Sequence, residues 1–207
     1  MKKLKINNKF IYLISPNKIN NNSFFKHLEE IFKTKKISFF QLRLKKTPKK
    51  RILAIGKKVQ KICINYKVKF IINDDPFLTK KIGADGCHIG QKDICIQKAR
   101  KILQQKIIGV TCHNSKKLIK KAIKNKADYI AIGAFFPSKT KKIKFKANLG
   151  LLKYTKKITK IPIISIGGIN LNNYKKLLLN KSNFLAISGY VWNNKKYKPR
   201  EAIEKLI

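Results

Sequence analysis

Cations and an amide alternate over residues 41–45, in the order Gln-Leu-Arg-Leu-Lys. Side chains two residues apart on an extended strand point to the same side, so Gln41, Arg43 and Lys45 are predicted to share one face. Two cations directed to one place repel each other and lose hydration unless an anion lies between them. Solvated surface charge is a plausible alternative for Lys45 alone, but Arg43 is one of only four arginines in the chain, which favours a function for it.

Carboxylates follow two later apolar segments. Asp74 and Asp75 end one such segment, directly before Pro76, and Asp93 lies in the loop after the next one. Magnesium is commonly bound by one or two carboxylates together with substrate phosphates. We therefore expect Asp74 and Asp93 to bind Mg²⁺ and Asp75 to cap the following helix. The alternative for Asp74 is a capping role of the same kind.

Hydroxyl, lysine and glycine residues follow the apolar segments nearer the C-terminus. Residues 134–141 read Ala-Phe-Phe-Pro-Ser-Lys-Thr-Lys, and Gly167-Gly168 and Ser188-Gly189 end two later segments. Backbone N–H groups at glycine turns before a helix are a common phosphate site in barrel enzymes. Two anion sites, one with a metal and one rich in glycine, indicate two phosphorylated substrates or one substrate with phosphates at both ends.

These residues must be positioned by a repeating set of strands and helices. Short segments rich in β-branched and aromatic residues alternate with stretches of helical periodicity, such as residues 24–32, 52–62, 118–123 and 171–179. With 207 residues in eight repeats of about 26, the pattern predicts an α/β protein, a single (β/α)8 TIM barrel over residues 1–207. A doubly wound open sheet is the alternative fold. The predicted strands are residues 10–15, 37–43, 68–73, 85–89, 106–111, 128–133, 161–166 and 183–188.

Turn residues predict two of the helix boundaries. Gly83 is placed to end a helix in the left-handed conformation. Thr47 and Pro48 resemble an N-cap followed by proline at the first helical position. In a barrel built this way, the polar residues described above fall at the carboxyl ends of the strands, where barrel active sites are formed.

The composition argues against several other classes of protein. No uncharged stretch reaches the roughly 18 apolar residues of a membrane helix. The apolar run at residues 10–14 is too short for a secretory signal, so we expect a cytoplasmic protein without a membrane partner. Cys87-His88 and Cys112-His113 suggest zinc, but adjacent residues on a strand point to opposite faces, so neither pair readily supplies two ligands.

The charge is strongly positive, with 50 Lys+Arg against 9 Asp+Glu and a net charge of +41. Such a charge is compatible with binding nucleic acid through its phosphates. A dedicated binder usually concentrates charge in one region and uses arginine, whereas here lysines are spread along the whole chain. We expect no specific nucleic-acid partner, and the sequence does not decide between a monomer and a homo-oligomer.

Six motifs, in order along the chain, resemble the thiamine-phosphate synthase family. The resemblance covers nearly the whole chain. It implies a barrel transferase of thiamine biosynthesis that joins a hydroxymethylpyrimidine diphosphate to a thiazole phosphate and releases diphosphate, with Mg²⁺ as cofactor. The motifs are QLRLK at 41–45, IND at 72–74, GADGCHIGQKD at 83–93, GVTCH at 109–113, FPSKTK at 136–141 and IGGI at 166–169.

The resemblance also implies a role for individual residues. Asp74 and Asp93 would ligate Mg²⁺, and Arg43, Lys45 and Lys141 would stabilise the leaving diphosphate. The pyrimidine diphosphate site would comprise Gln41, Leu42, Arg43, Leu44, Lys45, Asn73, Thr111 and Lys141. The thiazole phosphate site would comprise Ser138, Lys139, Thr140, Gly168, Ile187 and Ser188.

Two other functions stay open at this point. The related thiazole tautomerases are isomerases with the same barrel and thiazole phosphate site, but they need no metal or diphosphate ligands. The set Arg43, Lys45, Asp74, Asp93 and Lys141 therefore favours the synthase. A nucleic-acid-binding module is supported by the net charge alone.

Overall fold

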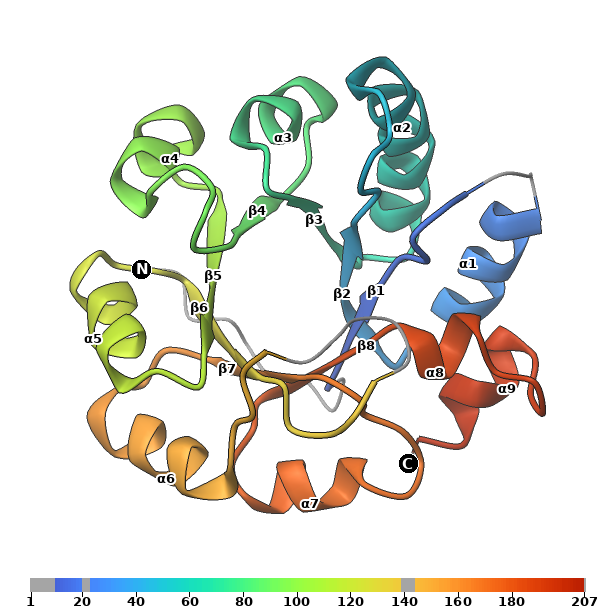
Figure 1. Cartoon of the computed structure of the whole chain (residues 1–207). Helices are drawn as coiled ribbons and strands as arrows, with labels where there is room; N and C mark the ends of the chain where they lie inside the picture. The colour runs from blue at the N-terminus through green and yellow to red at the C-terminus, as the bar shows by residue number, and fades with distance from the viewer. Residues whose placement is uncertain (1–9, 20–22, 139–143, 207) are drawn as a thin grey trace.

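The computed structural model describes residues 10–19, 23–138 and 144–206. Within these ranges eight parallel strands close into a barrel, because each strand pairs with the next and β1 pairs with β8 (Figure 1). The closed barrel confirms the predicted (β/α)8 fold and excludes the open sheet. The strands are β1 (Ile11–Ile14), β2 (Ile37–Leu42), β3 (Lys69–Asn73), β4 (Gly86–Ile89), β5 (Ile107–His113), β6 (Tyr129–Gly133), β7 (Ile163–Ile166) and β8 (Phe184–Ile187).

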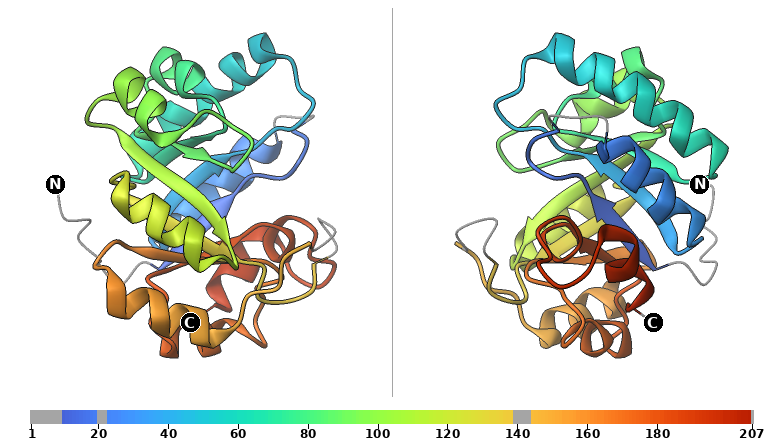
Figure 2. Two further views of the ribbon diagram at one scale, coloured as in Figure 1. Left: turned by 60° about the vertical axis from the view of Figure 1, so that its left-hand side comes forward. Right: turned by 90° about the vertical axis from the view of Figure 1, so that its right-hand side faces the viewer.

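The helices form a ring around the strands (Figure 1). Helix α1, for example, buries an apolar stripe of Phe24, Leu28, Ile31 and Phe32 in the outer core between helices and strands. The ring closes where α9 lies beside α1, which Figure 2 shows in red and blue. The helices are α1 (Ser23–Lys33), α2 (Lys49–Asn65), α3 (Pro76–Ile82), α4 (Ile96–Leu103), α5 (Lys116–Lys124), α6 (Leu149–Ile158), α7 (Tyr174–Leu179), α8 (Gly189–Trp192) and α9 (Pro199–Glu204).

The alternation of side chains along each strand produces two cores. On β2, Phe39 belongs to the cluster inside the barrel, and Phe40 belongs to the outer cluster between strands and helices. The same period sends Gln41 and Arg43 toward the barrel axis. It sends Leu42 and Leu44 into the outer core, where both are buried.

Polar side chains tie neighbouring strands together at the end of the barrel where strands begin. Asp85, Asp128 and Asn183 precede β4, β6 and β8. Each accepts a hydrogen bond from a backbone N–H near the start of the preceding strand, at 2.9, 2.8 and 2.9 Å respectively. Asp85 and Asp128 are therefore structural, which leaves other carboxylates for the opposite end of the barrel.

Two helix boundaries test the expectations from turn residues. Gly83 ends α3 with φ +82°, so the left-handed cap is confirmed. The predicted start of α2 is wrong by one residue: Pro48 occupies the N-cap position and Thr47 lies outside the helix. Within the described residues no helix is both long and apolar enough to cross a membrane.

Candidate active site

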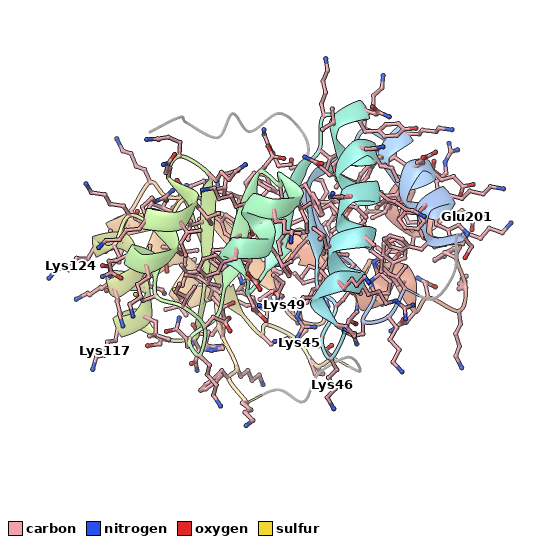
Figure 3. All side chains as sticks on the ribbon, turned by 90° about the horizontal axis from the view of Figure 1, so that it is seen from above. Lys45, Lys46, Lys49, Lys117, Lys124 and Glu201 are labelled. Carbon is pink, nitrogen blue, oxygen red and sulfur yellow. The ribbon has the colours of Figure 1, made fainter. Side chains whose placement is uncertain are left out.

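A basic cavity lies at the end of the barrel where the strands terminate, beside the loop between β2 and α2. Its volume is about 580 Å³, and its walls come from the segments that follow β1 and β2. Figure 3 shows Lys45, Lys46 and Lys49 along this part of the barrel, far from Lys117 and Lys124 on α5. The cavity gathers five cationic side chains, those of Lys18, Arg43, Lys45, Lys46 and Arg51.

The side chain of Arg43 is held at this cavity by the β1 loop. Its Nη1 donates to Oδ1 of Asn17 at 3.3 Å, and its backbone N–H donates to Oγ of Ser15 at 2.9 Å. Burial lowers the pKa of Arg43, and the nearby Asp74 carboxylate acts in the opposite direction. An arginine nevertheless keeps its charge near neutral pH, so Arg43 presents a fixed cation.

Two carboxylates lie side by side at the mouth. Asp74 directly follows β3, and its Oδ2 is 3.0 Å from Nζ of Lys45. Asp93, after β4, accepts the backbone N–H of Gly90 at 2.7 Å. Burial, together with the adjacent Asp74 carboxylate, raises the pKa of Asp93. Such like-charge crowding is relieved when a cation binds between the two groups.

The third aspartate of this region has a different role. Asp75 is the N-cap of α3, where Oδ1 accepts the backbone N–H of Leu78 at 2.9 Å. Its Oδ2 lies 2.8 Å from Nζ of Lys49. Burial alone would raise the pKa of Asp75, but these contacts outweigh it and leave the pKa below its usual value. The capping role predicted for Asp75 is confirmed.

The donor set at the mouth fits magnesium. In the part of the chain that the structure describes, no group of three or more His, Cys, Asp or Glu side chains is arranged to hold a metal. Mg²⁺ needs no such group, because one or two carboxylates suffice when substrate phosphates supply further oxygens. A zinc site from Cys87-His88 is disfavoured by direction, since Cys87 lies in the outer core and His88 bonds to Tyr129 and Thr111 inside the barrel.

The other residues implied for the pyrimidine diphosphate site lie on two different faces of the strands. Gln41 is buried at the end of β2, Asn73 ends β3, and Thr111 lies on β5. Leu42 and Leu44 pack their side chains in the outer core, so any contribution from them to this site is through the backbone. Lys141 lies outside the described residues.

The predicted thiazole phosphate site is described only in part. The loop after β6 lies against the Gly167–Gly168 turn, where the backbone N–H of Phe136 donates to the carbonyl of Gly167 at 3.1 Å. Ser138 continues that loop, and Ile187 ends β8. The hydroxyl of Ser188 donates to the carbonyl of Ser15 at 3.1 Å. Lys139 and Thr140 lie outside the described residues.

Position 168 requires glycine because its backbone lies very close to the backbone of the β6–α6 loop. The sequence did not predict this contact. The φ of Gly168 is +62°, and a Cβ there would lie 2.1 Å from the carbonyl oxygen of Pro137. The family resemblance assigns Gly168 to the thiazole phosphate site. In the structure the nearest obstacle is the backbone of the β6–α6 loop.

The barrel interior also contains a hydrogen-bonded set that sequence reasoning missed. The hydroxyl of Thr111 is 2.7 Å from Nε2 of His88, and Nδ1 of His88 is 2.9 Å from the hydroxyl of Tyr129. The Tyr129 hydroxyl is in turn 2.8 Å from that of Tyr12. The ring of His113, at the end of β5, lies 4.4 Å from that of Phe145 between centroids.

Comparison with known proteins decides the family. A sequence model described as thiamine monophosphate synthase matches residues 11–191. The chain belongs to this family. It is 66% identical to a thiamine-phosphate synthase of Pelagibacter ubique over the full length of both chains. It is 36% identical to one of Rhodospirillum centenum over 89% of each chain.

A solved structure of the family shows the same barrel. Thiamine phosphate pyrophosphorylase from Pyrococcus furiosus superposes with a TM-score of 0.84 at 26% identity. The match covers 97% of this chain and 94% of that one. The resemblance carried by the six motifs is therefore confirmed. Its residue-by-residue roles stay predictions, because no comparison tests them.

Proposed function

We propose that the mouth of this barrel performs the thiamine-phosphate synthase reaction. A hydroxymethylpyrimidine diphosphate and a thiazole phosphate are joined to give thiamine phosphate, and diphosphate is released. The observation that carries this assignment is the Asp74–Asp93 pair beside a cavity with five cations. That combination suits a metal-bound diphosphate, and the family of the chain supplies the reaction.

The cations of the mouth would assist departure of the diphosphate. The bond from the pyrimidine methylene carbon to the diphosphate oxygen breaks, and negative charge accumulates on that oxygen. Arg43 and Lys45, with Lys141 from the β6–α6 loop, would stabilise the charge through preorganised donors. The thiazole nitrogen, held close by, then forms the new carbon–nitrogen bond.

Mg²⁺ would be held by Asp74 and Asp93 and would neutralise charge on the diphosphate oxygens. Lys45 contacts Asp74 at 3.0 Å in the structure. Asp74 would help to hold the metal, and Lys45 would supply positive charge to the diphosphate. The ion pair between them keeps both side chains at the mouth of the barrel.

The site favours the synthase over a thiazole tautomerase. An isomerase that acts on the thiazole phosphate alone has one phosphate to bind, and it gains nothing from a carboxylate pair at a second anion site. Here the basic cavity is lined by the segments that follow β1 and β2, and the two carboxylates follow β3 and β4. Gly168 and Ser188 lie at the ends of β7 and β8.

The decisive assay combines both substrates with and without magnesium. We expect thiamine phosphate to form only when both substrates and Mg²⁺ are present. Asp93→Asn should lose this activity, whereas Glu204→Gln, which removes a carboxylate paired with Arg200 on α9, should retain it. Conversion of a thiazole phosphate isomer without any pyrimidine would instead identify a tautomerase.

Other parts of the interpretation stay predictions from the sequence. They are the single domain over residues 1–207, the cytoplasmic location and the lack of a specific nucleic-acid partner. Tight binding of DNA or RNA that collapses with added salt would support the alternative of a nonspecific nucleic-acid-binding module.

A further inference from the structure

Four polar side chains form a continuous hydrogen-bonded chain inside the barrel. It runs from Tyr12 on β1 to Tyr129 on β6, then to His88 on β4, and ends at Thr111 on β5. Three of the four members are buried, with exposed fractions of 2% for Tyr12, 1% for Tyr129 and 9% for His88. Thr111 is half-buried, so it is the end of the chain that a substrate can reach.

Burial fixes the protonation states along this chain. The ring of His88 is buried, and its two nitrogens contact the hydroxyls of Tyr129 and Thr111, so a neutral ring with one donor and one acceptor suits the site. Burial also raises the pKa of Tyr12 and of Tyr129, so both hydroxyls keep their protons. With neutral members throughout, the hydrogen bonds can run in one of two directions.

The proton of Tyr12 decides between the two directions. In the described part of the chain, its hydroxyl has no hydrogen-bond partner other than that of Tyr129. If the chain ran from Thr111 toward Tyr12, the last proton would be buried without an acceptor, which is costly. If it runs from Tyr12, every buried proton is used: Tyr12 donates to Tyr129, Tyr129 to Nδ1 of His88, and Nε2–H of His88 to Thr111.

We propose that Tyr12, Tyr129 and His88 are positioning residues that make Thr111 a hydrogen-bond donor to the pyrimidine substrate. Since Oγ1 of Thr111 already accepts from His88, its own proton is directed to the substrate. The matching group is an unprotonated ring nitrogen of the pyrimidine and not its amino group. This inference rests on the proposed function, because that function places the pyrimidine at Thr111.

The packing around Tyr129 supports a dedicated arrangement. A Cβ on Gly109 would lie 1.8 Å from Cζ of the Tyr129 ring, so a side chain at position 109 would displace the tyrosine. Tyr12 stacks on Phe39, with ring centroids 5.4 Å apart. The packing of these two rings therefore fixes the positions of the Tyr12 and Tyr129 hydroxyls.

The direction of the chain can be measured without any substrate. In the full-length protein labelled with ¹⁵N-histidine, the ring nitrogens of His88 are assigned by comparison with His88→Gln. At pH 7 we expect the neutral ring with its proton on Nε2. A proton on Nδ1 would overturn the inference and leave the proposed function untouched.

Kinetics test the consequence for the substrate. Tyr129→Phe removes the donor to His88, and it should raise the KM for the pyrimidine diphosphate about five-fold to ten-fold without changing the KM for the thiazole phosphate. Tyr174→Phe removes a buried tyrosine hydroxyl outside the barrel and should change neither KM. Thermal melts of both variants establish that they are folded. Unchanged kinetics in Tyr129→Phe would overturn the inference.

Substrate analogues identify the group that Thr111 recognises. In each analogue one ring nitrogen of the pyrimidine diphosphate is replaced by C–H. The wild-type protein should discriminate against one of the two analogues about ten-fold, Thr111→Ser should retain that discrimination, and Thr111→Val should lose it. Equal discrimination by wild type and Thr111→Val would refute the proposed recognition. A wild-type protein that makes no thiamine phosphate would refute the proposed function instead.

Discussion

Replacing His88 with a side chain that does not ionise should flatten the acid dependence of stability. Burial lowers the pKa of His88 from 6.5 to about 4, with Asp74 opposing the shift and Arg43 reinforcing it. In the unfolded chain the imidazole takes up a proton near its ordinary pKa, but in the folded barrel it resists. The contribution of neutral His88 to the unfolding free energy is therefore fully present above about pH 6.5 and declines as the pH falls toward 4. Below that it levels off, because both states are then protonated.

The size of the effect follows from these two pKa values. Between pH 7 and pH 5 the linkage amounts to about 2 kcal/mol of unfolding free energy. Urea unfolding of wild type and His88→Gln at pH 7, 6 and 5 measures it, with the comparison made between slopes because the substitution itself changes stability. Most carboxylates titrate below this pH window. Any carboxylate that titrates within it changes the unfolding free energy of wild type and variant equally.

A matched control separates His88 from histidines in general. His27 lies on α1, outside the barrel, and His27→Gln gives the background of losing one imidazole. We expect the wild type and His27→Gln to lose stability in parallel and His88→Gln to lose about 2 kcal/mol less. If all three lines were parallel, His88 would not be the buried neutral group on which the hydrogen-bond direction depends.

Three further predictions concern the mouth of the barrel. Asp93→Asn should abolish the magnesium-dependent reaction and leave the thermal melt close to that of wild type, because it removes a loop carboxylate and no core contact; full activity would remove Asp93 from the metal site. Arg43→Ala should reduce turnover by about 10²-fold or more, whereas Lys117→Ala on α5 should have no effect, and equal turnover in both would reassign Arg43 to surface charge. Gly168→Val should raise the KM for the thiazole phosphate selectively, since its side chain would displace the loop at Pro137. Equal losses for both substrates would indicate misfolding.

The strands could be predicted well from the sequence because their apolar runs are short and separated by turn residues. All eight were predicted within two residues of their observed ends, for example 37–43 against Ile37–Leu42. Helix starts were harder. The helix expected over 171–179 begins only at Tyr174, because the side chain of Asn173 accepts the backbone N–H of Asn170 at 2.9 Å and holds a turn there.

Parts of the site could be predicted because strand order alone brings them together. Asp74 and Asp93 follow the neighbouring strands β3 and β4, so their proximity needs no detail of packing. The Tyr12–Tyr129 contact joins residues 117 positions apart on opposite sides of the barrel. It depends on barrel closure and register, which periodicity does not encode. Gly109 was the available signal, since a glycine in the middle of a strand often marks a close approach.

The distribution of the acidic residues separates structural roles from chemical ones. Carboxylates are scarce in this chain, 9 against 50 Lys+Arg, so any one of them readily forms an ion pair with a lysine or arginine. Asp75, Asp85 and Asp128 each combine such an ion pair with a backbone N–H, an arrangement that stabilises a helix start or a strand joint. Asp74 and Asp93 instead lie beside each other, so that the pKa of Asp93 is raised. Folding alone gives no reason to place two carboxylates together among so many lysines, and a cation bound with a diphosphate does.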